Sequence, residues 1–273
     1  MRLVRTCSTS RRLLELIGNL RELNNARRSQ TCVELAEAQW ISPISVLPIA
    51  VYANHNRIGI NCLEEDRSIN SYLGTIYFPY GTDELSELEK SYLPITTLSC
   101  SDKNDCVLNE YEARILNNLP EKERQPFINS LKLLTSELVA NIREHAKVDD
   151  YWILAQYWDR TRTCEIAMCD TGIGYKESYQ GTSFEVEQHI DALRNALQGK
   201  SSKDPEERGA GIPTIVRMFV QGYGGEVMIM SGDSLLYVRQ RQSTPYRFDL
   251  EWQGSFVGIR FKLKAINFYE YLR

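Results

Sequence analysis

Three polar side chains recur at a regular interval near the middle of the chain. Within residues 133–145, LLTSELVANIREH, the side chains of Glu137, Asn141 and His145 are four positions apart. At about 100° per residue, this interval puts all three on one strip of an α-helix. A neighbouring strip is apolar and comprises Leu131, Leu134, Leu138 and Ile142. The pattern predicts a polar strip bordering the core, where an acid, an amide and an imidazole could meet a ligand, although a solvated helix face gives the same pattern.

A carboxylate stands beside two glycines where a buried strand is predicted to end. Residues 168–174 read MCDTGIG, so Asp170 follows an apolar stretch and precedes Gly172 and Gly174. An ionised carboxylate only accepts hydrogen bonds and can therefore hold an exocyclic amine such as that of adenine. Glycines let a planar base approach the backbone closely. The segment indicates a base-binding pocket or, taken by itself, an ordinary turn.

A glycine-rich loop opens a further predicted helix. Residues 207–216 read ERGAGIPTIV, with Gly209 and Gly211 ahead of an apolar run. The first N–H groups of a helix lack partners within the helix, and the helix dipole favours negative charge there. Such a loop can cradle a phosphate group. The preceding residues 200–208, KSSKDPEER, are polar enough to form a mobile segment.

The order and spacing of these segments resemble a known set of motifs. An E-x-x-x-N helix, a D-x-G-x-G turn after a strand and a G-x-G loop opening a helix are similar to the N, G1 and G2 boxes of the GHKL ATPase superfamily. That superfamily includes histidine kinases, gyrase, heat-shock chaperones and mismatch-repair ATPases. The resemblance covers residues 125–265 and implies an α+β sandwich. Residues 181–208 would form the mobile ATP lid, and 254–261 resembles the final strand, with Ser255 in place of threonine.

The resemblance implies a role for each matching residue. Asp170 would bind the adenine amino group, and Asn141 would coordinate Mg²⁺. Glu137 would orient or deprotonate the attacking water or hydroxyl. The remaining matches would shape the base pocket, lie against the phosphates or belong to the final strand, and they are Gly172, Gly174, Gly209, Gly211 and Ser255.

Some residues near these motifs have two interpretations. Others indicate which members of the superfamily the chain does not resemble. Arg208 and Lys203 either neutralise phosphate charge or are simply solvated. His145 either supports the site from behind or is a structural histidine. Pro213 stands where histidine kinases often have another glycine, and His55 is the only histidine upstream of the motifs. A standard sensor kinase is therefore disfavoured, whereas ATP binding is not.

Composition limits the classes of protein that fit. The chain has 273 residues, of which 42% are hydrophobic, and a formal net charge of −4. This charge gives no electrostatic reason to expect nucleic acid or an anionic membrane as a partner. The seven scattered cysteines suit reduced thiols rather than a disulfide scaffold. With no apolar run that suits a signal peptide or a membrane span, we expect a cytoplasmic protein.

Three segments are expected along the chain: a helical segment at 1–30, an α/β unit at 31–105 and the ATP-binding domain at 106–273. Helices are predicted at 11–24, from Ser42 onward, at 68–73 and from about 110 to 145 with a break at Pro120. Residues 33–38 and 58–60 read as strands, and 79–107 as the most loop-like passage. The α/β unit resembles a STAS-like domain, in which a strand leads into a helix that begins near a serine.

The two resemblances together are similar to anti-sigma-factor-type serine kinases. They imply a signalling protein that binds ATP and Mg²⁺ and hydrolyses ATP or transfers its phosphate to a protein serine. The alternative is a nucleotide-controlled switch that binds a partner protein with little or no turnover. A regulatory protein partner and a homodimer are expected by analogy with the relatives. Ser42 or Ser45 could carry a phosphate at the helix start, but a simple helix cap is favoured.

Overall fold

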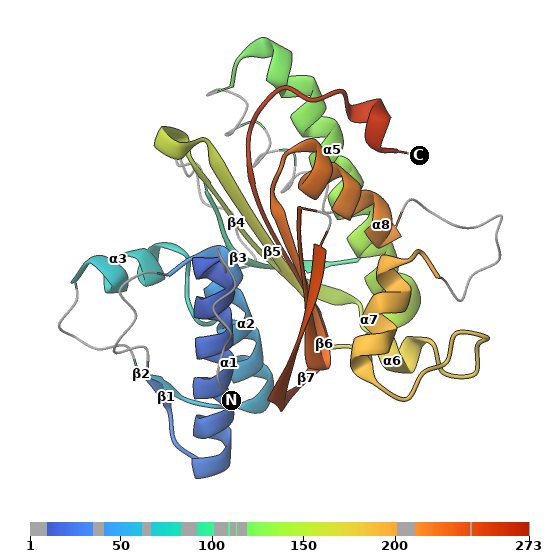
Figure 1. Cartoon of the computed structure of the whole chain (residues 1–273). Coiled ribbons are helices and arrows are strands. Elements are labelled where there is room, and N and C mark those ends of the chain that lie inside the picture. The colour runs from blue at the N-terminus through green and yellow to red at the C-terminus, as the bar shows by residue number, and fades with distance from the viewer. Residues whose placement is uncertain are drawn as a thin grey trace.

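The protein is built around one five-stranded antiparallel sheet (Figure 1). The computed structural model describes residues 10–34, 41–61, 67–82, 92–100, 119–200, 211–240 and 242–272, together with residues 109 and 113. The strands are β3 (Tyr92–Ser99), β4 (Asp150–Trp158), β5 (Thr163–Cys169), β6 (Glu226–Arg239) and β7 (Gln242–Lys262). Their order in the sheet is β3-β4-β5-β7-β6. Together with the helices, this sheet confirms the predicted α+β class.

The sheet separates two hydrophobic cores. Every residue of the central strand β5 is buried, and successive side chains of a strand point to opposite faces. Ile166 and Met168 belong to one core, whereas Ala167 and Cys169 belong to the other. A strand buried on both faces needs helices on each side.

Helices cover both faces of the sheet (Figure 1). The first core includes Leu134 of α5 (Glu121–Asn141), Leu193 of α7 (His189–Leu197) and Ile215 of α8 (Gly211–Val216). The second includes Leu16 of α1 (Arg11–Ser29) and Leu47 of α2 (Pro43–Asn56). A short helix, α6 (Gly174–Ser178), follows the turn after β5. The helices facing the first core surround the candidate site.

The N-terminal region packs on the sheet through its helices. A two-residue strand, β1 (Val33–Glu34), pairs in parallel with β2 (Ile60–Asn61), and α3 (Arg67–Thr75) follows. The expected loop at 79–107 is wrong in part, because β3 forms an edge strand of the main sheet within it. The predicted strand at 33–38 is described only as far as residue 34, and most of the predicted helix at 110–119 lies outside the described residues.

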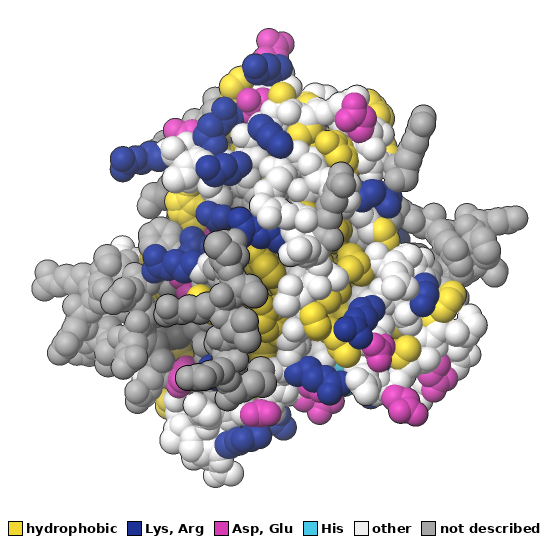
Figure 2. Space-filling view, in the orientation of Figure 1, with side chains coloured by type: hydrophobic (Ala, Val, Ile, Leu, Met, Phe, Trp, Pro, Cys, Tyr) yellow, Lys and Arg dark blue, Asp and Glu magenta, His cyan; other side chains and the backbone are white. Residues whose placement is uncertain are grey.

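Ion pairs also join α1 to the sheet. Arg12 donates to the buried Glu165 of β5 at 2.7 Å, and Arg260 of β7 donates to the same carboxylate at 3.1 Å. Ser10 donates to Glu226 of β6 at 2.8 Å. Figure 2 shows Lys and Arg side chains gathered near the start of α1. Burial raises the pKa of Glu165, although both arginines act to lower it.

Local signals placed the helix starts well. Ser42 and Ser45 form a reciprocal cap at the start of α2, and both are fully or almost fully buried. The capping interpretation is therefore confirmed, and neither hydroxyl is exposed as a phosphate acceptor. Helix α1 runs through Gly18 without a break. No helix in the described part of the chain is both long and apolar enough to cross a membrane.

Candidate functional site

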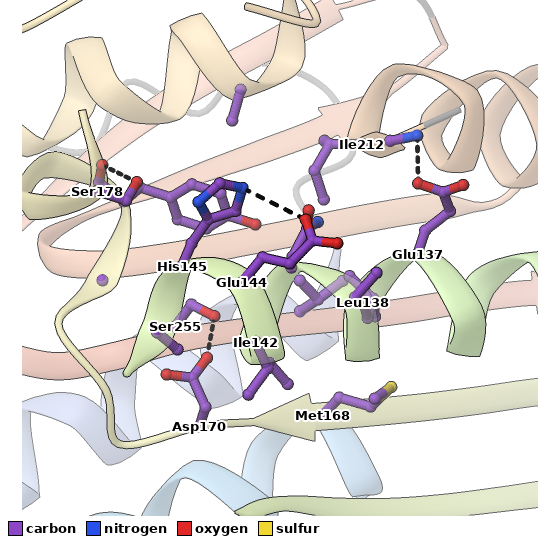
Figure 3. Close-up of a pocket in the computed structure, with 18 of the residues that line it drawn as sticks. Glu137, Leu138, Ile142, Glu144, His145, Met168, Asp170, Ser178, Ile212 and Ser255 are labelled. Atoms are coloured by element: carbon purple, nitrogen blue, oxygen red, sulfur yellow. Dashed lines mark hydrogen bonds and ion pairs between the residues drawn. The ribbon is translucent and has the colours of Figure 1, made fainter. Parts of the chain in front are cut away.

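A cavity of about 360 Å³ lies at one end of the first core. This volume is within the range of about 300–1,000 Å³ that is usual for small-molecule sites. Its walls come from α5 and the π-helical turn after it (Ile142–Ala146), the end of β5, residues 255 and 257 within β7, α6, the end of α7 and the start of α8. Figure 3 shows the side chains that point into it. All three predicted motifs therefore contribute to one cavity.

Asp170 is a buried acceptor in the wall of this cavity. It follows β5 directly and is 1% exposed. One carboxylate oxygen accepts the N–H of Gly172 at 2.8 Å, and the other accepts a short hydrogen bond from the hydroxyl of Ser255. Burial raises the pKa of Asp170, and these two hydrogen bonds oppose that shift. Because a carboxylate has about four acceptor positions, Asp170 can accept a further donor from a ligand.

The two glycines after Asp170 are required by close contacts. A Cβ at Gly172 would overlap the carbonyl oxygen of Ala146, which also accepts the N–H of Ile173 at 2.9 Å. The φ of Gly174 is +77°, and a Cβ there would overlap the hydroxyl of Ser231. The loop is therefore pressed against the helix that carries the first motif.

The polar strip of α5 reaches the same cavity. Glu137, Asn141 and His145 all line it, as the helical spacing predicts. Glu137 Oε2 accepts the N–H of Gly211, the first residue of α8, at 2.6 Å. His145 Nε2 lies 3.9 Å from Glu144 Oε2 (Figure 3). Asp170 and the glutamate of the first motif thus border opposite regions of one cavity, next to different loops.

The predicted phosphate loop is described only at its end. Arg208, Gly209 and Lys203 lie outside the described residues, whereas Gly211 lines the cavity. Pro213 fits the first turn of α8, because the N–H that proline lacks would have no partner within the helix there. The expected lid at 181–208 is wrong in part, since α7 forms within it and its apolar face joins the core.

Sequence reasoning missed two residues in or beside the site. Ser231 of β6 accepts the N–H of Tyr175 at 3.1 Å and donates to the carbonyl of Gly254 at 2.8 Å, so it links the loop after β5 to β7. Lys200 lines the cavity and donates to Asn195 at 3.0 Å. The only sequence signal for Lys200 is its place at the start of the polar segment, and Ser231 has none.

Neither the arrangement of possible metal ligands nor the comparison with known proteins assigns a further role to this site. Among the described residues, no group of three or more His, Cys, Asp or Glu side chains could hold a metal ion. Asn141 lines the cavity and its side chain contains an amide oxygen, and Mg²⁺ in nucleotide sites often takes only one or two protein ligands, with phosphates and waters completing its coordination. No family model, no curated protein and no solved structure matches this chain.

Proposed function

We propose that the cavity binds Mg·ATP in the manner of GHKL ATPases, and that the protein is a signalling ATPase or protein serine kinase. The observation that carries this proposal is that a buried acceptor, Asp170, and the backbone N–H of Gly211 at the start of α8 lie at one cavity. The acceptor suits the amino group of adenine, and the helix start suits a phosphate. Their separation across one cavity suits a ligand with a base at one end and phosphates at the other.

The residues of the cavity have distinct roles in this proposal. Asp170, held by Gly172 and Ser255, accepts the adenine amine and orients the base. Asn141 contributes an amide oxygen to Mg²⁺, and the bound ion supplies positive charge that stabilises the phosphates. Lys200 adds a cation at the cavity wall.

Glu137 is the proposed general base. Its carboxylate accepts the proton of a water or serine hydroxyl while the oxygen bonds to the γ-phosphorus and the bond to ADP breaks. The acceptor serine is proposed to belong to a partner protein, and the two serines considered within this chain, Ser42 and Ser45, are buried in the helix cap. The partner is then the regulated protein in a cytoplasmic switch.

A second candidate function is a switch that binds ATP with little or no turnover. The bond between Glu137 and the Gly211 N–H favours it, because a base that is held in this way is not available to a nucleophile. In this version, ATP rearranges the start of α8 and changes the contacts with a partner protein.

Calorimetric titration with Mg·ATP and a phosphate-release assay test the proposal together. The wild type is expected to bind ATP and release phosphate, and Glu137→Gln is expected to bind ATP without release. Glu144→Gln is the matched control, because Glu144 lines the same cavity and is expected to keep both activities. Binding without release in the wild type favours the switch. Absence of ATP binding in the wild type refutes the proposed site.

A further inference from the structure

The carboxylate of Glu137 occupies the helix start that the proposed function assigns to phosphate. Glu137 Oε2 accepts the N–H of Gly211 at 2.6 Å, a short distance typical of a charged acceptor. The two residues are 74 positions apart in the sequence and meet across the cavity. Figure 3 shows the Glu137 side chain extending from α5 toward the start of α8.

This contact already resembles an anion bound at a helix start. Helical backbone continues from α8 into a π-helical segment that ends at Gly222, and Gly211 is the first residue of α8 that the structure describes. The first N–H groups of such a helix need an acceptor from outside it. Glu137 supplies that acceptor from α5.

A phosphate group cannot share this N–H with the carboxylate without cost. The hydrogen can make one strong bond, and two negative groups placed around it repel each other. Among the described residues, the other charged groups at the cavity do not replace the carboxylate at this N–H. Glu144 and His145 lie on the π-helical turn beyond Glu137, and the amine of Lys200 is held by Asn195.

We propose that Glu137 is an internal competitor for the phosphates of the nucleotide. Its carboxylate accepts the N–H of Gly211 at the start of α8. An arriving phosphate takes over the Gly211 N–H and releases the carboxylate into the cavity. The general base then becomes available only when a phosphate has taken over the Gly211 N–H, which couples proton transfer to nucleotide binding. This inference rests on the proposed function and adds a mode of regulation to it.

The decisive variant is Glu137→Gln, which keeps the shape of the side chain and removes its charge. A charged acceptor holds the Gly211 N–H more strongly than a neutral one, by a free energy that corresponds to roughly a tenfold change in affinity. ATP is therefore expected to bind the variant about tenfold more tightly than the wild type. Adenosine has no phosphate and does not need the Gly211 N–H. Its affinity is expected to stay within about twofold of the wild-type value.

The comparison uses the full chain, calorimetry and both ligands with Mg²⁺ present. Glu144→Gln is the control for a general loss of negative charge at the cavity, and its effect on ATP affinity is expected to be less than about threefold. The proposal is overturned if Glu137→Gln binds ATP no more tightly than the wild type while adenosine binding is retained. It is also overturned if Glu144→Gln has an equal effect. A wild type that binds neither adenosine nor ATP refutes the nucleotide site itself, a different result.

Discussion

Replacing Asp170 by asparagine tests the base-binding end of the cavity. The change keeps the size of the side chain and exchanges one acceptor oxygen for an NH₂ donor. The native carboxylate accepts hydrogen bonds from Gly172 and Ser255 and has acceptor capacity left for a ligand. Asparagine has fewer acceptor positions. The adenine amine is therefore expected to face either the NH₂ group of the asparagine, which is a donor, or its oxygen, which is already occupied.

The magnitude follows from the loss of one charged hydrogen bond to the ligand. Such bonds contribute about 1.5–3 kcal/mol, which corresponds to a loss of about 10- to 100-fold in ATP affinity. Stability is expected to change less, by about 1 kcal/mol. Burial already raises the pKa of Asp170, so a neutral asparagine removes a desolvation cost while it weakens the bonds from Gly172 and Ser255.

Calorimetry with ATP and inosine triphosphate separates base recognition from general damage. Inosine carries a carbonyl oxygen where adenine carries the amine, so it suits a donor rather than an acceptor. The wild type is expected to prefer ATP, and Asp170→Asn is expected to lose or reverse that preference. Thermal unfolding without nucleotide checks that the variant is folded. An unchanged ratio of the two affinities in a folded variant would refute the assignment of Asp170 to the base.

Three further predictions concern stability. Gly172→Ala is expected to lose about 1–3 kcal/mol in urea unfolding, because its Cβ would overlap the carbonyl of Ala146. Gly18→Ala is expected to gain about 0.5–1 kcal/mol in the same assay, because Gly18 is exposed within α1 and no atom lies within 4 Å of an added Cβ; a loss would contradict the helix seen there. Burial raises the pKa of folded Glu165, so the unfolded chain releases this proton at lower pH. The free energy of unfolding of the wild type should therefore fall relative to that of Glu165→Gln as the pH rises from about 4.3 toward the raised pKa. Urea unfolding of both proteins across this pH range checks the slope, and a rise instead of a fall would count against a raised pKa.

The helix and turn motifs were predictable because their signals are local. The interval from Glu137 to His145 sets one face of a helix, and Ser42 caps α2 through that helix's own first turn. Strand β3 was missed because Pro94 and the polar residues after it suggested a loop, yet pairing with β4 supplies its backbone partners. Helix α7 was missed because the surrounding polar residues suggested a lid, whereas its apolar face is buried against the core.

The sequence by itself determined which side chains could do chemistry and on which local elements they stand, because helical periodicity and turn preferences act over a few residues. Only the tertiary structure decided which of these groups meet. Ser231 bonds to Tyr175 across 56 positions, and Arg12 bonds to Glu165 across 153. Such contacts depend on strand order and on which helices cover each face of the sheet, and no local pattern encodes either. The bond of Glu137 to the start of α8 belongs to the same group.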